Sequence, residues 1–209
     1  MASIVIHMCV ASEINKQIKV KNYNEFLLGA IAPDISRVVG WSRDLSHFID
    51  SKQNIYPDMN KFLEKYGNKL DNDFILGYFV HLYTDYLWFK YFIRDIKYKG
   101  LITLRDGTKI DYDENTFRKY LYDDYTDLNV KLLDEYNLDL SLFYNPVVKP
   151  NVEMNEIPID RLQELLDASS VIIENSKNKK NYLFDMTNIK EFILVSCDLI
   201  IGEILKNKA

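Results

Sequence analysis

The sequence has little cysteine, glycine or proline, and it has no run of basic residues. Cys9 and Cys197 are the only cysteines, which excludes a disulfide framework and favours a reducing compartment. The 7 glycines and 5 prolines form no linker that could separate two domains. A net charge of -5 without a basic run argues against a stable complex with nucleic acid. We therefore expect one cytoplasmic domain over residues 1–209, and the high use of Lys, Asn, Ile and Tyr is typical of an AT-rich bacterial genome.

No segment is typical of a targeting or transmembrane element. Residues 1–11 are apolar but lack a basic leading region and contain His7, so we expect them to belong to the mature protein. Residues 74–93 are long enough to span a bilayer, but they contain His81 and Asp85. A carboxylate at the centre of a span costs roughly 2.5–3.5 kcal/mol. A buried core helix is the better interpretation of this segment.

Apolar residues recur with a period of about 3.6 along most of the chain, which indicates helices. A hydrophobic content of 47% in 209 residues is enough for one large core. The predicted fold class is therefore all-α, a single-domain helical bundle, with Pro57 in a first helical turn and Asp71, Asp160 and Thr187 as N-caps. The predicted helices are 7–20, 24–31, 57–69, 71–95, 114–135, 160–175 and 187–206.

Two segments depart from the helical pattern. In residues 101–112, two short apolar stretches flank Asp106 and Gly107, and this dipeptide is a strong hairpin signal. Residues 140–158 contain three prolines, each of which disfavours helix at the preceding residue. We predict a small hairpin in the first segment, and in the second a long surface loop that borders a functional cleft.

All three histidines lie within the first 81 residues. His81 and Asp85 are four residues apart on the predicted core helix, so their side chains share a face and could chelate a metal ion. The alternative is a hydrogen-bonded pair inside the core. A buried carboxylate without a cation is costly, and no Lys or Arg shares this face within one turn, which favours a metal ion or a partner from elsewhere in the chain. Taken alone, His7, Asp34 and His47 are more typical of ordinary core, turn and loop residues.

Four short motifs follow one another in the first half of the chain. They are His7 before an amphipathic helix, FLLGAIAPD at 26–34, SHF at 46–48 and GYFVHLYTDY at 77–86. Their order and wording resemble the zinc-dependent phospholipase C family, whose helical fold is shared with fungal single-strand nucleases. The resemblance implies one tetrahedral zinc ion and a second ion that Asp85 bridges to His7. The ligands implied for the first ion are Asp34, His47, His81 and Asp85.

Well-known members of that family hold a further ion with two histidines and a glutamate downstream, whereas no histidine follows His81 in this sequence. We expect that site to be lost or rebuilt from carboxylates, with Asp124 as the candidate ligand beside Asp123 and Asp127. A solvated acidic patch is the alternative interpretation. A carboxylate-rich ligand set would also allow manganese, iron or magnesium to compete with zinc.

The function that the resemblance implies is hydrolysis of a phosphoester by a metal-activated water. Asp34 would be both a ligand and a candidate general base, and the substrate would be a lipid or a small soluble diester. The alternative is a non-catalytic helical module that a closed metal ion stabilises. A metal phosphohydrolase of the HD type is disfavoured because no adjacent His-Asp pair occurs. No feature of the sequence indicates an oligomeric state.

Overall fold

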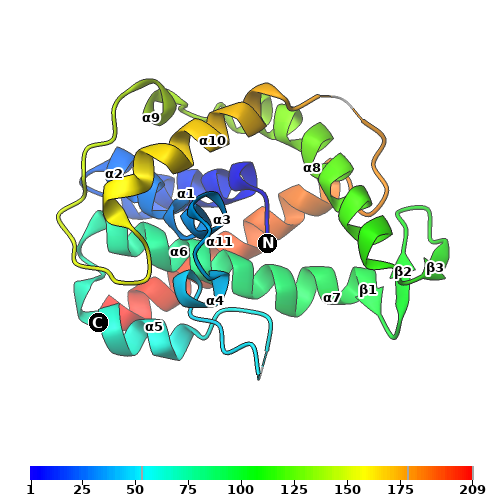
Figure 1. Cartoon of the computed structure of the whole chain (residues 1–209), viewed down its shortest axis with the longest axis horizontal. Helices are drawn as coiled ribbons and strands as arrows, with labels where there is room; N and C mark the ends of the chain where they lie inside the picture. Colours follow the sequence, from blue (N-terminus) through cyan, green and yellow to red (C-terminus); the bar gives the residue numbers. More distant parts are fainter. Residues whose placement is uncertain (53, 178, 209) are drawn as a thin grey trace.

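The computed structural model describes residues 1–52, 54–177 and 179–208. These residues form a helical bundle with a small three-stranded sheet at one end, which confirms the predicted all-α class (Figure 1). The elements are α1 (Ile4–Ile18), α2 (Tyr23–Gly29), η1 (Ala32–Asp34), α3 (Ile35–Val39), α4 (Arg43–Ser46), α5 (Met59–Tyr66), η2 (Gly67–Lys69), α6 (Asp73–Leu87), η3 (Trp88–Phe92), α7 (Ile93–Ile96), β1 (Lys97–Tyr98), β2 (Leu101–Thr103), β3 (Lys109–Asp111), α8 (Glu114–Tyr136), α9 (Ser141–Tyr144), η4 (Ile159–Arg161), α10 (Leu162–Glu174) and α11 (Met186–Lys208).

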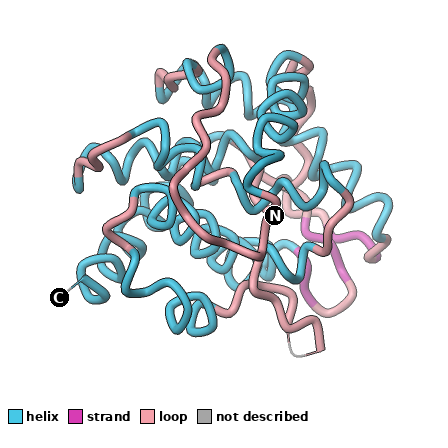
Figure 2. Tube along the Cα trace, turned by 60° about the vertical axis from the view of Figure 1, so that its left-hand side comes forward, coloured by secondary structure: helices cyan, strands magenta, loops and turns pink. Residues whose placement is uncertain are grey.

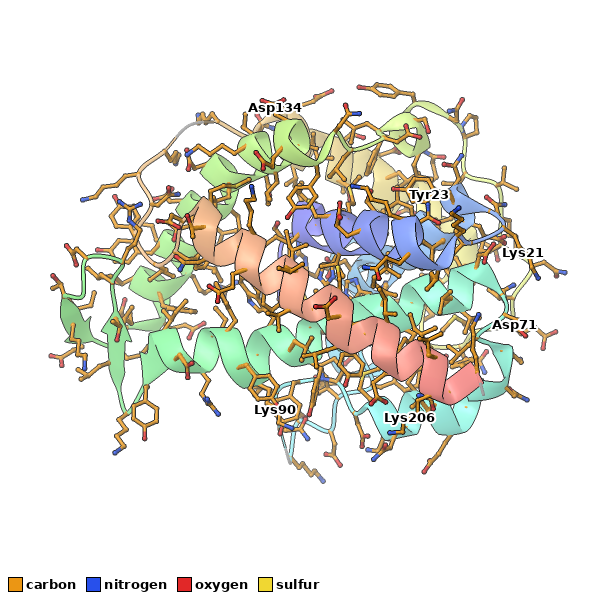
Figure 3. All side chains as sticks on the ribbon, turned by 180° about the vertical axis from the view of Figure 1, so that it is seen from behind. Lys21, Tyr23, Asp71, Lys90, Asp134 and Lys206 are labelled. Atoms are coloured by element: carbon orange, nitrogen blue, oxygen red, sulfur yellow. The ribbon has the colours of Figure 1, made fainter. Side chains whose placement is uncertain are left out.

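Helix α6 lies at the centre of the bundle. Most of its residues are buried, and it packs against α1, α2 and α11. A π-helical turn, η3, joins α6 to α7, so the predicted helix 71–95 appears as three consecutive helical pieces. Helix α11 crosses the back of the molecule over α1 and α6 (Figure 3). Within the described residues, none of the helices combines the length and the apolar character that a bilayer crossing requires.

Three helices begin at capping residues one or two positions away from those expected. Asp58 caps α5 and Asn72 caps α6, each through a side-chain oxygen that accepts backbone N–H groups. Asp185 accepts N–H groups at the start of α11 in the same way. Asp71 and Thr187 are themselves capable of capping, so the local sequence does not distinguish them from Asn72 and Asp185. Pro57 precedes α5 instead of lying in its first turn. The three residues expected as N-caps do not cap their helices: Asp71, Asp160 and Thr187.

The two predicted departures from helix are both present. Strands β2 and β3 pair antiparallel with Ile102 opposite Ile110, and Gly107 occupies their turn with a φ of 85°. Strand β1 adds to the other edge of β2, and the sheet adjoins α7 (Figure 2). Residues 140–158 are mostly loop, interrupted by the short helix α9.

Helices α2 and α6 touch through their backbones at two glycines. A Cβ atom on Gly77 would lie 2.0 Å from the carbonyl oxygen of Phe26, and one on Gly29 would lie 2.1 Å from that of Phe74. Any side chain at either position would therefore force the helices apart. This close approach holds α2, and the turn that follows it, against the first two turns of α6.

Candidate metal centre

Five side chains singled out in the sequence meet at a buried centre. His7 comes from α1, Asp34 from η1, and His47 from the residue that ends α4. His81 and Asp85 come from consecutive turns of α6. Each of the five residues is at most 5% exposed. The fold therefore converts five weak sequence signals into one cluster of donor atoms.

The donor atoms form two overlapping groups. His7, Asp34 and His81 offer ligand atoms within 4.8 Å of one another, and so do His47, His81 and Asp85. His81 belongs to both groups, but a single imidazole nitrogen binds only one ion, whereas a carboxylate can bridge two. The Asp85 carboxylate lies 3.5 Å from Nε2 of His7 and 3.6 Å from Nε2 of His47. These contacts are compatible with a bridging carboxylate at position 85.

The hydrogen bonds of His47 and His81 aim a free nitrogen of each ring at the same place. Nδ1 of His81 donates to the carbonyl oxygen of Ala30 at 2.8 Å. Nδ1 of His47 lies 2.8 Å from the hydroxyl oxygen of Ser46, which itself donates to the carbonyl oxygen of Arg43. Nδ1 of His81 therefore carries the proton and its Nε2 a lone pair, and the same holds for His47 in the tautomer in which its Nδ1 donates to Ser46. In that tautomer the two Nε2 atoms, which are 3.2 Å apart, repel each other unless a cation lies against them.

Burial keeps these two imidazoles neutral. It lowers the pKa of His47 to about 3, and the positive charge of Arg43 acts in the same direction. Burial, followed by the neighbouring His7, also holds the pKa of His81 well below its usual range. Because the neutral imidazole is the form that binds metal ions, both side chains are ready ligands.

Three further atoms of the centre have no hydrogen-bond partner among the described residues. They are both ring nitrogens of His7 and Oδ1 of Asp34. A buried polar atom without a partner costs about 1–3 kcal/mol. Divalent ions bound at the centre would give partners to an imidazole nitrogen of His7 and to the carboxylate oxygen of Asp34, and mixed nitrogen and oxygen donors are typical of zinc sites. The residues present therefore fit a zinc ion.

Asp85 has partners from two distant segments. Its Oδ1 accepts the backbone N–H of Ala2 at 3.0 Å, and its Oδ2 accepts Nη2 of Arg43 at 3.2 Å. Burial acts to raise the pKa of Asp85, but the amino terminus and His7 overcome this effect and hold the pKa well below its usual range. Arg43 belongs to none of the four motifs and lies 42 residues away in sequence. The only sequence signal for it is the need for a partner to the buried carboxylate.

A narrow cleft reaches the centre at Asp34. Its volume is about 140 Å³, and Asp34 is the member of the five that lines it. Contrary to expectation, the loop 140–158 does not contribute to its walls. Glu156 of that loop instead accepts a hydrogen bond from the hydroxyl of Tyr66 on α5. Most of the cleft walls are apolar and come from the N-terminal residues, α3, α8 and α10, including Ile4, Val38, Leu121, Tyr125, Leu165 and Ile172.

Asp124 does not join the other five predicted ligands. Its two carboxylate oxygens accept the backbone N–H groups of residues 182–184 at 2.7, 2.7 and 3.1 Å. The flanking Asp123 and Asp127 both bind Lys179, one through its ammonium and the other through its backbone N–H. These carboxylates therefore attach the segment before α11 to helix α8. Both oxygens of Asp124 are engaged, so its contacts do not support a rebuilt ion site.

We expect Asp124→Asn to lower stability and to leave the metal content unchanged. An asparagine side chain has one acceptor oxygen in place of two, so at least one buried N–H group loses its partner. The expected cost is about 1–3 kcal/mol, measured by urea unfolding. Asp123→Asn is the matched control, because its lysine pairs are at the surface and should contribute at most about 1 kcal/mol. Loss of metal from the Asp124 variant at unchanged stability would return this residue to the ligand set.

Comparison with known families supports the assignment of the centre. Residues 6–97 match the family model of zinc dependent phospholipase C. No curated protein and no solved structure matches the chain significantly. The matched segment runs from α1 to β1 and contains all five residues of the centre. Residues 6–97 are therefore similar to the zinc-dependent phospholipase C family, in agreement with the resemblance of the four motifs.

Proposed function

We propose that this protein is a metal-dependent phosphoester hydrolase that uses the buried centre. The observation that carries the proposal is the 3.2 Å contact between the Nε2 atoms of His47 and His81, beside the buried carboxylates of Asp34 and Asp85. A bound divalent ion would supply Lewis acidity for the attack of water on phosphorus and for departure of the leaving oxygen. The family and the donor set both favour zinc.

The five residues of the centre would have different tasks. His47, His81 and Asp85 would hold one ion together with Asp34, and His7 would hold a second ion that Asp85 bridges. Asp34 lines the cleft, so we assign it to accept a proton from the attacking water as well. The partners of Nδ1 in His47 and His81 fix the orientation of both rings before substrate arrives.

The cleft favours a small substrate. The family suggests a lipid phosphoester, but the volume of the cleft is about 140 Å³. An apolar cavity of about 150 Å³ holds one benzene molecule. The cleft therefore fits an aryl ring or a short alkyl group better than two acyl chains. We propose that the protein hydrolyses a small soluble phosphodiester more readily than bilayer phosphatidylcholine.

Chelation and metal addition test the proposed function. Protein purified without added metal is first examined by elemental analysis and is then assayed with bis-p-nitrophenyl phosphate and with phosphatidylcholine vesicles. We expect a chelator to abolish hydrolysis of the soluble diester and zinc to restore it. The chelator should also lower the melting temperature, because Asp34 and Asp85 lose their compensating cation.

Each alternative has its own outcome in this experiment. An unchanged melting curve in protein whose metal has been removed would argue against the centre itself. Tightly bound metal without hydrolysis of any phosphoester would support the non-catalytic, metal-stabilised module instead. Rapid turnover of vesicles without activity on soluble diesters would reverse the proposed substrate preference.

A further inference from the structure

Arg43 is the basic residue that contacts the metal centre directly. It is the first residue of α4, and its Nη2 lies 3.2 Å from Oδ2 of Asp85. Its Nε lies 2.9 Å from the sulfur of Met1, and its guanidinium stacks over Phe89 at 5.2 Å from the ring centroid. The side chain nevertheless remains 29% exposed. Arg43 thus reaches from solvent to a buried carboxylate.

The contact uses only part of the guanidinium. Arginine has five N–H donors in a rigid planar fork, and the protein contacts of Arg43 involve Nε and Nη2. Within residues 1–52, 54–177 and 179–208, Nη1 has no hydrogen-bond partner. A planar fork with donors to spare is suited to the oxygens of a phosphate group. Its position beside the carboxylate places any such oxygen next to the ion-binding atoms.

The charges around the centre also favour an anionic ligand. Asp34 and Asp85 are the two carboxylates of the centre, and the cationic groups that face them are Arg43, Arg37 and the amino terminus. Arg37 lines the cleft beside Asp34. Because the two arginines offset the two carboxylates even when both are ionised, a divalent ion leaves the centre with a net positive charge. A site of this kind attracts an anion.

We propose that Arg43 is a phosphate-binding residue of this centre, which donates to the non-bridging oxygens of an anionic phosphoryl group. The proposal rests on the proposed function. It also explains why an arginine and His47 both approach Oδ2 of Asp85. The competing interpretation is that Arg43 is only an internal counter-ion of Asp85. The two interpretations differ in what removal of the guanidinium does to phosphate binding.

Arg43→Gln and Arg43→Lys test the proposal with two binding measurements on the full chain. Zinc affinity is measured by competition with a chelating dye, and inorganic phosphate affinity by calorimetry on the zinc-loaded protein. We expect Arg43→Gln to bind zinc as tightly as the wild type or more tightly, because a competing cation is gone. Phosphate binding should weaken about 10–100-fold, which corresponds to the loss of one charge-assisted hydrogen bond. Arg43→Lys should retain part of that affinity.

The matched control is Arg94→Gln, which removes the same charge from an exposed arginine of α7 that pairs with Asp95. It should change neither constant. Unchanged phosphate affinity in Arg43→Gln would overturn the proposal and leave Arg43 as a counter-ion. Weakened zinc binding would overturn it as well, because Arg43 would then only hold Asp85 in place. A third outcome separates the two proposals. If phosphate binding depends on Arg43 but the zinc-loaded protein hydrolyses no phosphoester, the role of Arg43 is supported and the proposed function is refuted.

Discussion

Asp85→Asn should remove more metal from each chain than His7→Ala, and both variants should lose phosphodiester hydrolysis. Asparagine keeps the size of aspartate but removes the charge that attracts both ions. His7 contacts Asp85 from one side only, so its loss should release only the second ion. Outer-shell residues typically change metal affinity or activity by roughly 10–100-fold, and a shared ligand should exceed that range. Elemental analysis and the rate with bis-p-nitrophenyl phosphate measure the two effects.

Asp73→Asn is the matched control for this comparison. Asp73 is another carboxylate of α6, and it accepts the backbone N–H of Asn22 outside the metal centre. This variant should keep the wild-type metal content and rate. If Asp85→Asn also keeps both, its carboxylate is only a hydrogen-bond acceptor of the core. The assignment of the centre around His81 would then be wrong.

Gly77→Ala should be among the most destabilising single substitutions in this protein. The new methyl group would lie 2.0 Å from the carbonyl oxygen of Phe26 and 2.8 Å from the backbone nitrogen of Ala30. Both obstacles are backbone atoms, so no rotamer change relieves the clash and helices α2 and α6 must separate. We expect a loss of about 4 kcal/mol or more in the free energy of unfolding, or failure to fold. Denaturant unfolding followed by circular dichroism measures it.

Gly202→Ala provides the control, because Gly202 lies within α11 and a Cβ atom there would meet no atom within 4 Å. Alanine should stabilise that helix by about 0.5–1 kcal/mol relative to glycine. Similar unfolding midpoints for the two alanine variants would show that α2 and α6 are not in backbone contact. A folded Gly77→Ala protein would also have a displaced Ala30 carbonyl, which should weaken zinc binding through His81.

The helices could be predicted from the sequence because their apolar periodicity is strong. The hairpin could be predicted equally well, because Asp106 and Gly107 between two short apolar stretches strongly favour a tight turn. The first residues of the helices were harder to predict, because Asn72 lies beside Asp71 and Asp185 lies near Thr187, which have similar capping ability. Local sequence determines where helices and turns form. The predicted helix starts were wrong where two nearby residues can both cap the helix.

The five residues of the centre could be found from spacing and resemblance, but their mutual contacts could not. The partner of Asp85, Arg43, comes from a segment without a recognisable pattern, and only the fold, in which α4 packs against η1 and α3, brings the two together. Asp124 illustrates the opposite case. Its position on α8, three residues before Asp127, is typical of a ligand pair. Its partners are the backbone N–H groups of residues 182–184, and a sequence pattern does not predict contacts to backbone so far along the chain.

The walls of the cleft have an evolutionary consequence. Residues 6–97 contain the side chains that we propose to bind ions, whereas α8 and α10 supply much of the apolar surface around Asp34 and lie outside the family match. Mutations in these two helices can therefore reshape the entrance without altering any ligand. Selection for a new substrate and selection for a working centre would act on separate stretches of the gene. Homologues with identical ion-binding residues should accordingly diverge in the molecules they accept.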